Sequence, residues 1–304
     1  MTSALAGKVA VVAGATRGCG RAIAVELGAS GATVFAAGRS TRERRSEMNR
    51  SETIEETAEL ITAAGGTGIP VRCDFLVQDD VDALRGRIAS EAGGRVDVLI
   101  DDVWGGDPFI DWDTPFWEQD VERSVRAWRN GLETHLRALH ALLPLVTAGP
   151  GGLVVEVTDG VADGNSGSLV YDQVKAGVRR LALGLSEQLP EFGGTALAAT
   201  PGFLRSEAML DHFKVTEENW RDGIAVDPHF ALSETPHLLG RGIARLAADE
   251  ERARWNGDIV TSHALADAYE VDDLDGSRPD WPRWMKDVVS GGLPVEQADP
   301  AAYR

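Results

Sequence analysis

The chain has 304 residues, with 48 acidic against 30 basic side chains and a formal net charge of −18. This charge opposes binding to nucleic acid or to an anionic membrane, so we expect neither partner, and an anionic ligand needs a local basic cluster. There is no signal-like N-terminus and no apolar run long enough for a membrane span, and the two cysteines, Cys19 and Cys73, form no CxxC pair. These features predict a soluble, cytoplasmic protein with reduced thiols.

The stretch from residue 8 to residue 39 predicts a strand, a tight turn, a helix and a second strand. Its apolar runs are Val9–Ala13 and Ala32–Ala37, and the turn between them contains Gly14, Gly18 and Gly20. A helix that begins at such a turn directs free backbone N–H groups and the positive end of its dipole at a ligand. The stretch therefore predicts a phosphate-binding loop of a dinucleotide site.

Helices and strands continue to alternate along the chain. The predicted helices span residues 51–64, 78–92, 116–143, 171–189 and 237–248, and the predicted strands span residues 68–72, 95–100, 152–157, 194–199 and 258–261. We expect the longest helix to be interrupted near Asn130-Gly131 and to end at Pro144. The alternation predicts an α/β fold with a central parallel sheet, helices on both of its faces and a ligand site at its carboxyl edge.

A strongly charged segment, Arg39–Arg50, follows the second strand, where the adenosine ribose of a bound dinucleotide lies. An acid at this position binds the ribose 2′-hydroxyl, whereas an arginine accommodates a 2′-phosphate. Arg39 at the strand end and Arg17 in the glycine turn therefore predict NADP(H) as the cofactor. A solvated loop is the alternative interpretation of the segment.

The chemistry is indicated by Tyr171 and Lys175, which lie four residues apart in a predicted helix. At this spacing the two side chains share one face of the helix. A nearby cation lowers the pKa of a phenol from its ordinary value of about 10. Tyr171 is thus a candidate general acid for a carbonyl oxygen that receives hydride, or the base for the reverse oxidation. The alternative is an ordinary surface pair.

Four motifs together resemble the short-chain dehydrogenases/reductases, over about residues 6–265. The motifs are Gly14-Ala-Thr-Arg-Gly18-Cys-Gly20, Cys73-Asp74-Phe75, Tyr171-xxx-Lys175 and Pro201-Gly202-Phe203. The resemblance implies a single doubly wound Rossmann domain over residues 1–265, with a substrate lid at about residues 203–229. Residues 266–304 would form a C-terminal extension packed on the domain, as in an extended bacterial subgroup.

The implied function is NADP(H)-dependent interconversion of a small-molecule carbonyl and its alcohol by a homodimer or homotetramer. The family pattern and the glycine turn together give the expected cofactor-binding residues: Gly14, Thr16, Arg17, Gly18, Gly20, Arg39, Ser40, Asp74, Phe75, Lys175, Pro201 and Gly202. The expected catalytic residues are Tyr171, Lys175 and Thr158, of which Thr158 would orient the substrate oxygen.

The chain departs from the family pattern at three places. Asp101 and Asp102 stand where the family has two asparagines, and they either bond backbone N–H groups or carry a role in the site. The family serine is replaced by Thr158 or, after a one-residue shift, by Asp159. The asparagine of the family's proton relay is matched only approximately, by Asn130.

The remaining predictions concern the substrate, metals and alternative functions. Asp159, Trp104 and Phe203 are candidate substrate contacts, and the six histidines lack ligand spacing, so no metal is expected. The departures keep two alternatives open: a cofactor-binding scaffold or redox sensor without turnover, and an isomerase or dehydratase that uses bound cofactor.

Overall fold

The computed structural model describes residues 3–160 and 166–304 and contains a parallel sheet of seven strands in the order β3-β2-β1-β4-β5-β6-β7. This is the doubly wound Rossmann arrangement, in which the strand order reverses between β1 and β4. The predicted fold class is confirmed. The strands are β1 Val9–Ala13, β2 Thr33–Gly38, β3 Thr67–Arg72, β4 Val98–Asp101, β5 Leu153–Val157, β6 Thr195–Thr200 and β7 Ile259–Thr261.

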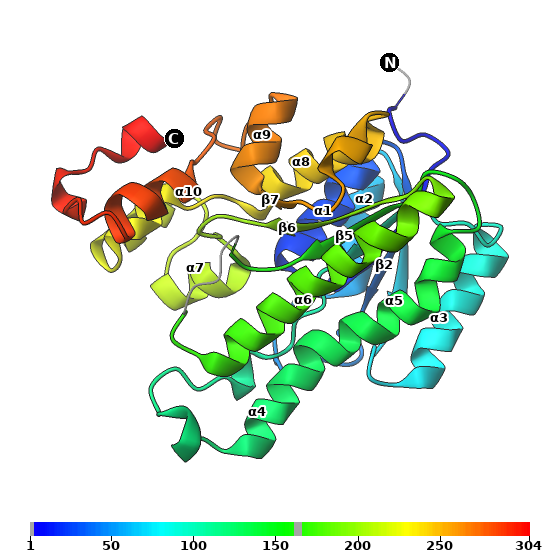
Figure 1. The fold of residues 1–304 in the computed structure, drawn as a ribbon, viewed down its shortest axis with the longest axis horizontal. Coiled ribbons are helices and arrows are strands. Elements are labelled where there is room, and N and C mark those ends of the chain that lie inside the picture. The colour runs from blue at the N-terminus through cyan, green and yellow to red at the C-terminus, as the bar shows by residue number, and fades with distance from the viewer. Residues whose placement is uncertain (1–2, 161–165) are drawn as a thin grey trace.

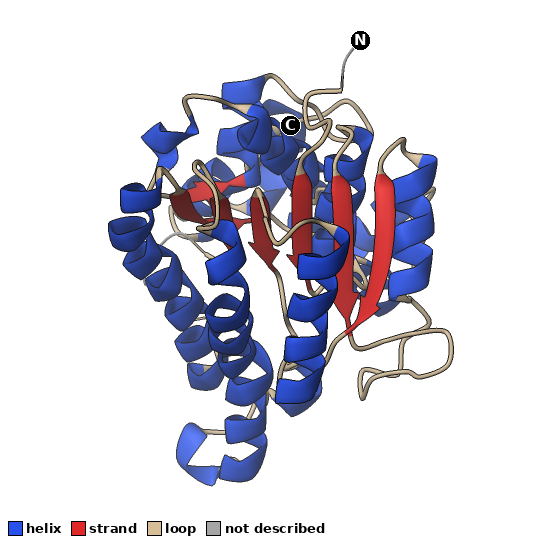
Figure 2. Cartoon of the chain, turned by 90° about the vertical axis from the view of Figure 1, so that its right-hand side faces the viewer, coloured by secondary structure: helices blue, strands red, loops and turns tan. Residues whose placement is uncertain are grey.

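Helices cover both faces of this sheet (Figures 1 and 2). They are α1 Gly18–Ala29, α2 Ile54–Ala63, α3 Gln78–Glu91, α4 Val121–Trp128, α5 Thr134–Val146, α6 Leu169–Gln188, α7 Glu207–Phe213, α8 Pro236–Ala248, α9 Ser262–Tyr269 and α10 Trp281–Trp284. Among the described residues, no helix is both long enough and apolar enough to cross a lipid bilayer.

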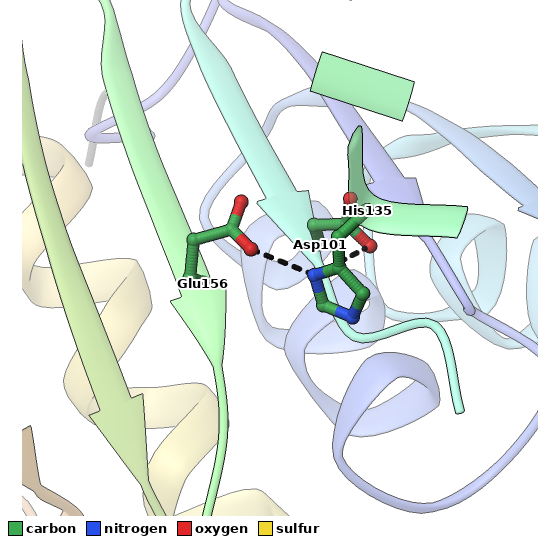
Figure 3. Close-up of side chains that lie close together, drawn as sticks. All are labelled: Asp101, His135 and Glu156. Carbon is green, nitrogen blue, oxygen red and sulfur yellow. Dashed lines mark hydrogen bonds and ion pairs between the residues drawn. The ribbon is translucent and has the colours of Figure 1, made fainter. Parts of the chain in front are cut away.

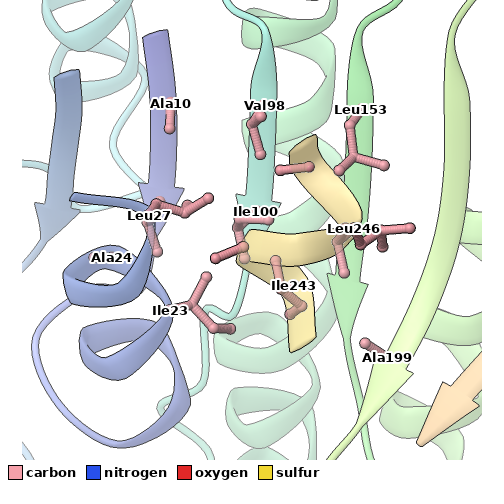
Figure 4. Close-up of a cluster of buried hydrophobic side chains, with 14 of the residues drawn as sticks. Ala10, Ile23, Ala24, Leu27, Val98, Ile100, Leu153, Ala199, Ile243 and Leu246 are labelled. Carbon is pink, nitrogen blue, oxygen red and sulfur yellow. The ribbon is translucent and has the colours of Figure 1, made fainter. Parts of the chain in front are cut away.

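The apolar core lies in two layers because successive side chains of a strand point to opposite faces. In β1, Val12 packs in the layer with α1 and α8, which Figure 4 shows, and Val11 packs in the layer with α3 and α5. Both valines are fully buried. The sheet is thus fixed between two helical layers, which holds the carboxyl ends of its strands in place as a platform for a site.

The longest predicted helix differs from the expectation in its details. The segment contains α4 and α5 joined by a π-helical turn, Arg129–Glu133, so the helix is widened at Asn130 instead of broken. Its end was also predicted wrongly, because α5 continues past Pro144 to Val146. The last turn persists although proline lacks an N–H, since Leu145 and Val146 are buried against the sheet.

The chain after α9 packs on the segment between β6 and α8. Helix α9 itself crosses residue 265, the predicted boundary of the extension. Trp284 and Tyr303 are buried with Leu232, and together they form a small apolar cluster separate from the two layers of the sheet. Figure 1 shows this C-terminal segment, orange to red, beside the yellow segment that follows α7. The extension therefore covers the predicted lid region.

Candidate active site

A cavity of about 920 Å³ opens at the carboxyl edge of the sheet. It lies beside β1 and β4, where the strand order reverses and where such sheets bind their ligands. Nearly all the predicted site residues line it. They are Gly14, Thr16, Arg17, Gly18, Arg39, Ser40, Asp74, Phe75, Trp104, Thr158, Asp159, Tyr171, Lys175, Pro201, Gly202 and Phe203. Gly20 lies next to this lining, in the first turn of α1.

The glycine turn brings backbone into contact with backbone. Gly14 has φ +85°, and a Cβ there would lie 2.3 Å from the carbonyl oxygen of Asp102. A Cβ on Gly20 would lie 2.4 Å from the carbonyl oxygen of Gly14. Only glycine allows this close approach, which leaves the N-terminus of α1 open to the cavity. The local sequence thus builds an anion site from N–H groups and the helix dipole.

A carboxylate from α7, within the predicted lid segment, contacts this anion site. The backbone N–H of Gly18 donates to Oε2 of Glu207 at 2.9 Å, and Nη1 of Arg21 lies 4.0 Å from the other oxygen. Glu207 is the first residue of α7, so the contact joins the two ends of the Rossmann domain. The contact shows that this N–H group can bind an anion.

Arg39 also lines the cavity and is paired with an acid. Its Nη1 lies 3.0 Å from Oε2 of Glu47, and Glu47 also accepts from Nδ2 of Asn130 at 3.2 Å. The same Asn130 amide donates to the carbonyl oxygen of Gly105 at 2.9 Å. The charged loop therefore folds toward the π-helical turn between α4 and α5, and Glu47 holds the Arg39 guanidinium at the lining of the cavity.

Tyr171 and Lys175 lie on the face of α6 that lines the cavity, as their spacing predicted. The ammonium nitrogen of Lys175 lies 4.4 Å from the ring centre of Trp104 and 5.4 Å from that of Tyr171. Trp104 meets Tyr171 edge to face with 5.6 Å between the ring centres, and Trp112 lies 5.3 Å from the same ring. These aromatic contacts fix the phenol beside a cation.

Thr158, which was expected to orient the substrate oxygen, is bonded to the backbone instead. The Thr158 hydroxyl is buried and donates to the carbonyl oxygen of Lys175 at 2.9 Å, so it is committed to the backbone of α6. The group that touches the phenol of Tyr171 is Asp159, whose Oδ2 lies 2.7 Å from the hydroxyl oxygen of Tyr171. Burial, together with this carboxylate, holds the pKa of Tyr171 well above its ordinary value. An acceptor therefore stands where the family places a hydroxyl donor.

Asp101, His135 and Glu156 form a buried triad (Figure 3), and their chain neighbours Asp102, Thr134 and Val157 line the cavity. Asp101 and Glu156 are neighbours across β4 and β5, and Nδ1 of His135 lies 2.7 Å from Glu156 and 3.5 Å from Asp101. Burial raises the pKa of Asp101 to about 7. Although burial opposes it, the two carboxylates raise the pKa of His135 to about 9. The triad is best described as an imidazolium held between two acids.

The triad also supports the loop that carries Trp104. Nε2 of His135 lies 3.0 Å from the carbonyl oxygen of Val103, and the N–H of Val103 donates to Asp101 at 3.2 Å. Asp101 thus bonds a backbone N–H group, which is one of the two roles that the sequence left open for it. The three side chains could also offer ligand atoms to a metal ion, because these atoms lie within 4.8 Å of one another. The 2.7 Å separation between Nδ1 and Glu156 is that of a hydrogen bond.

Comparison with known proteins identifies the family. A sequence model described as short chain dehydrogenase matches residues 8–215. The chain belongs to the short-chain dehydrogenase family. It is 30% identical over 306 residues to Dehydrogenase/reductase SDR family member 1 from Mus musculus, covering 98% of this chain and 91% of that protein.

Solved structures share the fold of this short-chain dehydrogenase. L-sorbose reductase from Gluconobacter frateurii, complexed with NADPH and L-sorbose, has a TM-score of 0.70 and 20% identity over 91% of this chain and 98% of its own. A 7α-hydroxysteroid dehydrogenase complexed with NADH has a TM-score of 0.68 and 21% identity over 84% and 93%. The predicted family is confirmed, and with it an oxidoreductase of a family that uses nicotinamide cofactors.

Several residues of the cavity of this short-chain dehydrogenase were not predicted from the sequence. Glu207 and Arg50 line it, and so does Trp281, which comes from the C-terminal extension. Trp281 packs against Phe203 with 5.4 Å between the ring centres. These residues lie far apart in the sequence, and no motif or spacing indicates that they share one cavity. Trp281 follows Pro279 and Asp280, which indicate a turn but do not say where the tryptophan packs.

The contact of Glu207 with the anion site leads to a prediction for cofactor binding. Replacing Glu207 with alanine should tighten NADPH binding about two- to fivefold, because it removes a competing carboxylate and a negative charge at the N-terminus of a helix. Titration of NADPH fluorescence measures the effect. Glu218→Ala is the matched control, since Glu218 is an exposed lid acid outside the cavity lining. Weaker binding by Glu207→Ala would show that Glu207 helps to hold the cofactor.

Proposed function

We propose that this short-chain dehydrogenase is an NADP(H)-dependent oxidoreductase that interconverts a small-molecule carbonyl and its alcohol, with Tyr171 transferring the proton. The observation that carries the proposal is that one cavity is lined both by the glycine turn and Arg39 and by Tyr171 and Lys175. A dinucleotide needs an anion site and a site for its reactive ring within one cavity. The bound cofactor supplies or accepts the hydride.

The residues present fit a nicotinamide dinucleotide. The close backbone packing at Gly14 and the carboxylate on the Gly18 N–H group support a pyrophosphate site at the start of α1. Arg17 and Arg39 supply the positive charge that a 2′-phosphate requires in a chain of net charge −18. Asp74 and Phe75 line the adenine side, and Pro201 and Gly202 line the other end.

The protein's own contribution is placement and proton transfer. Lys175 brings a positive charge to the phenol and, by its position in the cavity, is suited to hold the nicotinamide ribose. Trp104 and Trp112 hold the phenol ring against the cavity wall. Tyr171 then exchanges a proton between its hydroxyl oxygen and the oxygen of the substrate.

The lining also supports a substrate class. Trp104 and Trp112 contact the ring of Tyr171, and Phe203 and Trp281 line the same cavity, so its aromatic lining favours a flat apolar substrate. Asp107 lines the same cavity, and an acid there disfavours an anionic group close to Tyr171. We therefore propose an uncharged alicyclic or aromatic alcohol and its ketone as the substrate pair.

A simple assay tests the function. NADPH consumption with cyclohexanone, and NADPH formation from NADP⁺ with cyclohexanol, should both be measurable and should depend on Tyr171. Binding of NADPH without turnover over a panel of such ketones would favour the cofactor-binding scaffold. Conversion of a substrate without net consumption of NADPH would favour the isomerase or dehydratase.

The cofactor choice gives a separate prediction. Replacing Arg39 with aspartate should weaken NADPH binding at least about tenfold and leave NADH binding equal or stronger, because a charge-assisted hydrogen bond to the 2′-phosphate is lost. Arg42→Asp is the control, since Arg42 is exposed, pairs with Glu59 and does not line the cavity. Equal loss of affinity for both nucleotides would remove Arg39 as the residue that selects NADP(H).

The remaining predictions about partners extend this proposal. A homodimer or homotetramer through the long helices is supported by Leu136 of α5 and Leu183 of α6, which are large apolar side chains exposed at 46% and 38%. We retain a cytoplasmic location and the absence of nucleic acid and membrane partners as proposals, on the basis of the charge.

A further inference from the structure

We propose that Asp159 is the final proton acceptor of the site and that it works through Tyr171 when the enzyme oxidises an alcohol. The proposal rests on the proposed function of Tyr171. It assigns Asp159 a role different from the substrate contact that the sequence predicted. In the reduction of a carbonyl, the proton would follow the same path in reverse, from Asp159 through Tyr171 to the substrate oxygen.

The geometry of the pair carries the proposal. The hydroxyl oxygen of Tyr171 and Oδ2 of Asp159 are 2.7 Å apart. An ionised carboxylate can only accept a hydrogen bond, so the phenol must donate its hydrogen to Asp159. The lone pairs of the phenol oxygen then remain free to accept from a substrate hydroxyl. A phenol in this state can receive a proton from an alcohol while it passes its own hydrogen to Asp159.

The neighbouring hydroxyl does not compete for this task. Thr158 donates to the carbonyl oxygen of Lys175 and is buried, whereas Asp159 is exposed. A proton that reaches Asp159 can therefore pass directly to solvent. The chain thus provides an exit for the proton at the residue that touches the phenol, and no further side chain is needed for release.

The step balances in atoms and electrons. The O–H bond of the alcohol breaks and a new O–H bond forms at the oxygen of Tyr171, while the original hydrogen of Tyr171 moves to Oδ2 of Asp159. The electron pair of the carbinol C–H bond leaves as hydride to the oxidised nicotinamide. The product is a carbonyl compound, a reduced nicotinamide and a carboxylic acid at Asp159, which then releases its proton to water.

The charges around the phenol explain why a relay is needed. Lys175 is the nearest cation and lies 5.4 Å from the phenol ring, while Asp107, Asp159 and Asp172 surround the phenol with negative charge. The lid contributes Glu207 and His212 to the same cavity. Because burial and the acids raise the pKa of Tyr171, a free phenolate is scarce at neutral pH. A proton passed on to Asp159 avoids the phenolate.

A titration tests the coupling without any substrate. The chain has three tyrosines, so isotope-labelled tyrosine gives an NMR spectrum in which Tyr171 is assigned by its loss in Tyr171→Phe. Asp159→Asn should lower the titration midpoint of Tyr171 by more than about one pH unit. Asp172→Asn is the matched control, because Asp172 lies near the phenol but bonds the backbone N–H of Ser166. An unchanged midpoint in Asp159→Asn would overturn the proposal.

A pH profile tests the direction of proton flow, with cyclohexanol and NADP⁺ as the probe. In the wild-type enzyme Asp159 takes the proton from Tyr171, so the oxidation rate at about pH 7 should not depend on ionisation of the phenol. In Asp159→Asn the phenol itself must ionise, so the oxidation rate should fall as the pH drops below the range in which phenols titrate. The rate at about pH 7 should then be lower than in the wild type on the order of 100-fold, and it should recover in alkali. Asp159→Ser, which introduces the hydroxyl found in the family, should show the same dependence of the oxidation rate on pH.

The outcomes separate this proposal from the function on which it rests. A dependence of the oxidation rate on pH that is unchanged in Asp159→Asn, or a loss of activity that alkali does not restore, overturns the relay and leaves the function of Tyr171 in place. Full activity of Tyr171→Phe overturns the proposed function itself. Unchanged NADPH binding by the Asp159 variants shows that the cofactor site is intact in each comparison.

Discussion

Replacing Tyr171 with phenylalanine is expected to lower kcat about 10³-fold, the size typical of losing a positioned general acid or base. The ring should keep its place, because its contacts with Trp104 and Trp112 do not involve the hydroxyl. NADPH affinity should therefore change little, and the loss should appear in kcat more than in KM. Steady-state rates with cyclohexanol and NADP⁺, together with NADPH titration, measure the two quantities.

The chain offers a close control for this substitution. Tyr269 donates to Oδ2 of Asp249 at 2.7 Å, the same kind of phenol–carboxylate bond, but it lies outside the cavity lining. Tyr269→Phe should leave kcat unchanged. If both variants lost activity equally, the effect would be structural, and if Tyr171→Phe kept full activity, another group would carry the proton.

The parts of the site that could be predicted are those specified by local geometry. Gly14 and Gly18 lie in one turn before one helix, and Tyr171 and Lys175 lie one helical turn apart, so their positions follow from helix periodicity. The sheet followed from the same kind of rule, because apolar runs alternate with helices along the chain. In these cases the distance along the sequence determines the distance in space.

The parts that could not be predicted depend on contacts between distant segments. Glu207 meets Gly18 across 189 positions, and Trp281 reaches the cavity from the extension. The buried triad joins Asp101, His135 and Glu156 from two strands and a helix, and no ligand spacing along the chain reveals it. The sequence raised the choice between Thr158 and Asp159 after β5 but could not decide it, because which side chain turns toward Tyr171 depends on the loop conformation.

Replacing the buried arginine of the lid, Arg205, with methionine is expected to lower the free energy of unfolding by about 3–5 kcal/mol. The side chain is fully buried and its Nη2 lies 2.9 Å from Glu217 and 3.8 Å from Asp273, while Nη1 donates to the carbonyl oxygen of Ser233. Asp273 is itself buried, so removing the cation leaves a carboxylate without its compensating charge in the interior. Urea unfolding followed by circular dichroism measures the loss.

Arg221 also stacks on the ring of Trp220, so it serves as a control that distinguishes the effect of the buried charge of Arg205 from the effect of stacking. Arg205 lies 4.2 Å from the ring centre of Trp220 and Arg221 lies 4.5 Å from it, but Arg221 is exposed. Arg221→Met should therefore cost no more than about 1 kcal/mol, as expected for an exposed site. Equal losses in the two variants would mean that the stacking on Trp220 holds the lid. A larger loss in Arg205→Met would mean that the ion pairs between the lid and the C-terminal extension hold it, and the extension would then be part of what keeps the cavity of this short-chain dehydrogenase in shape.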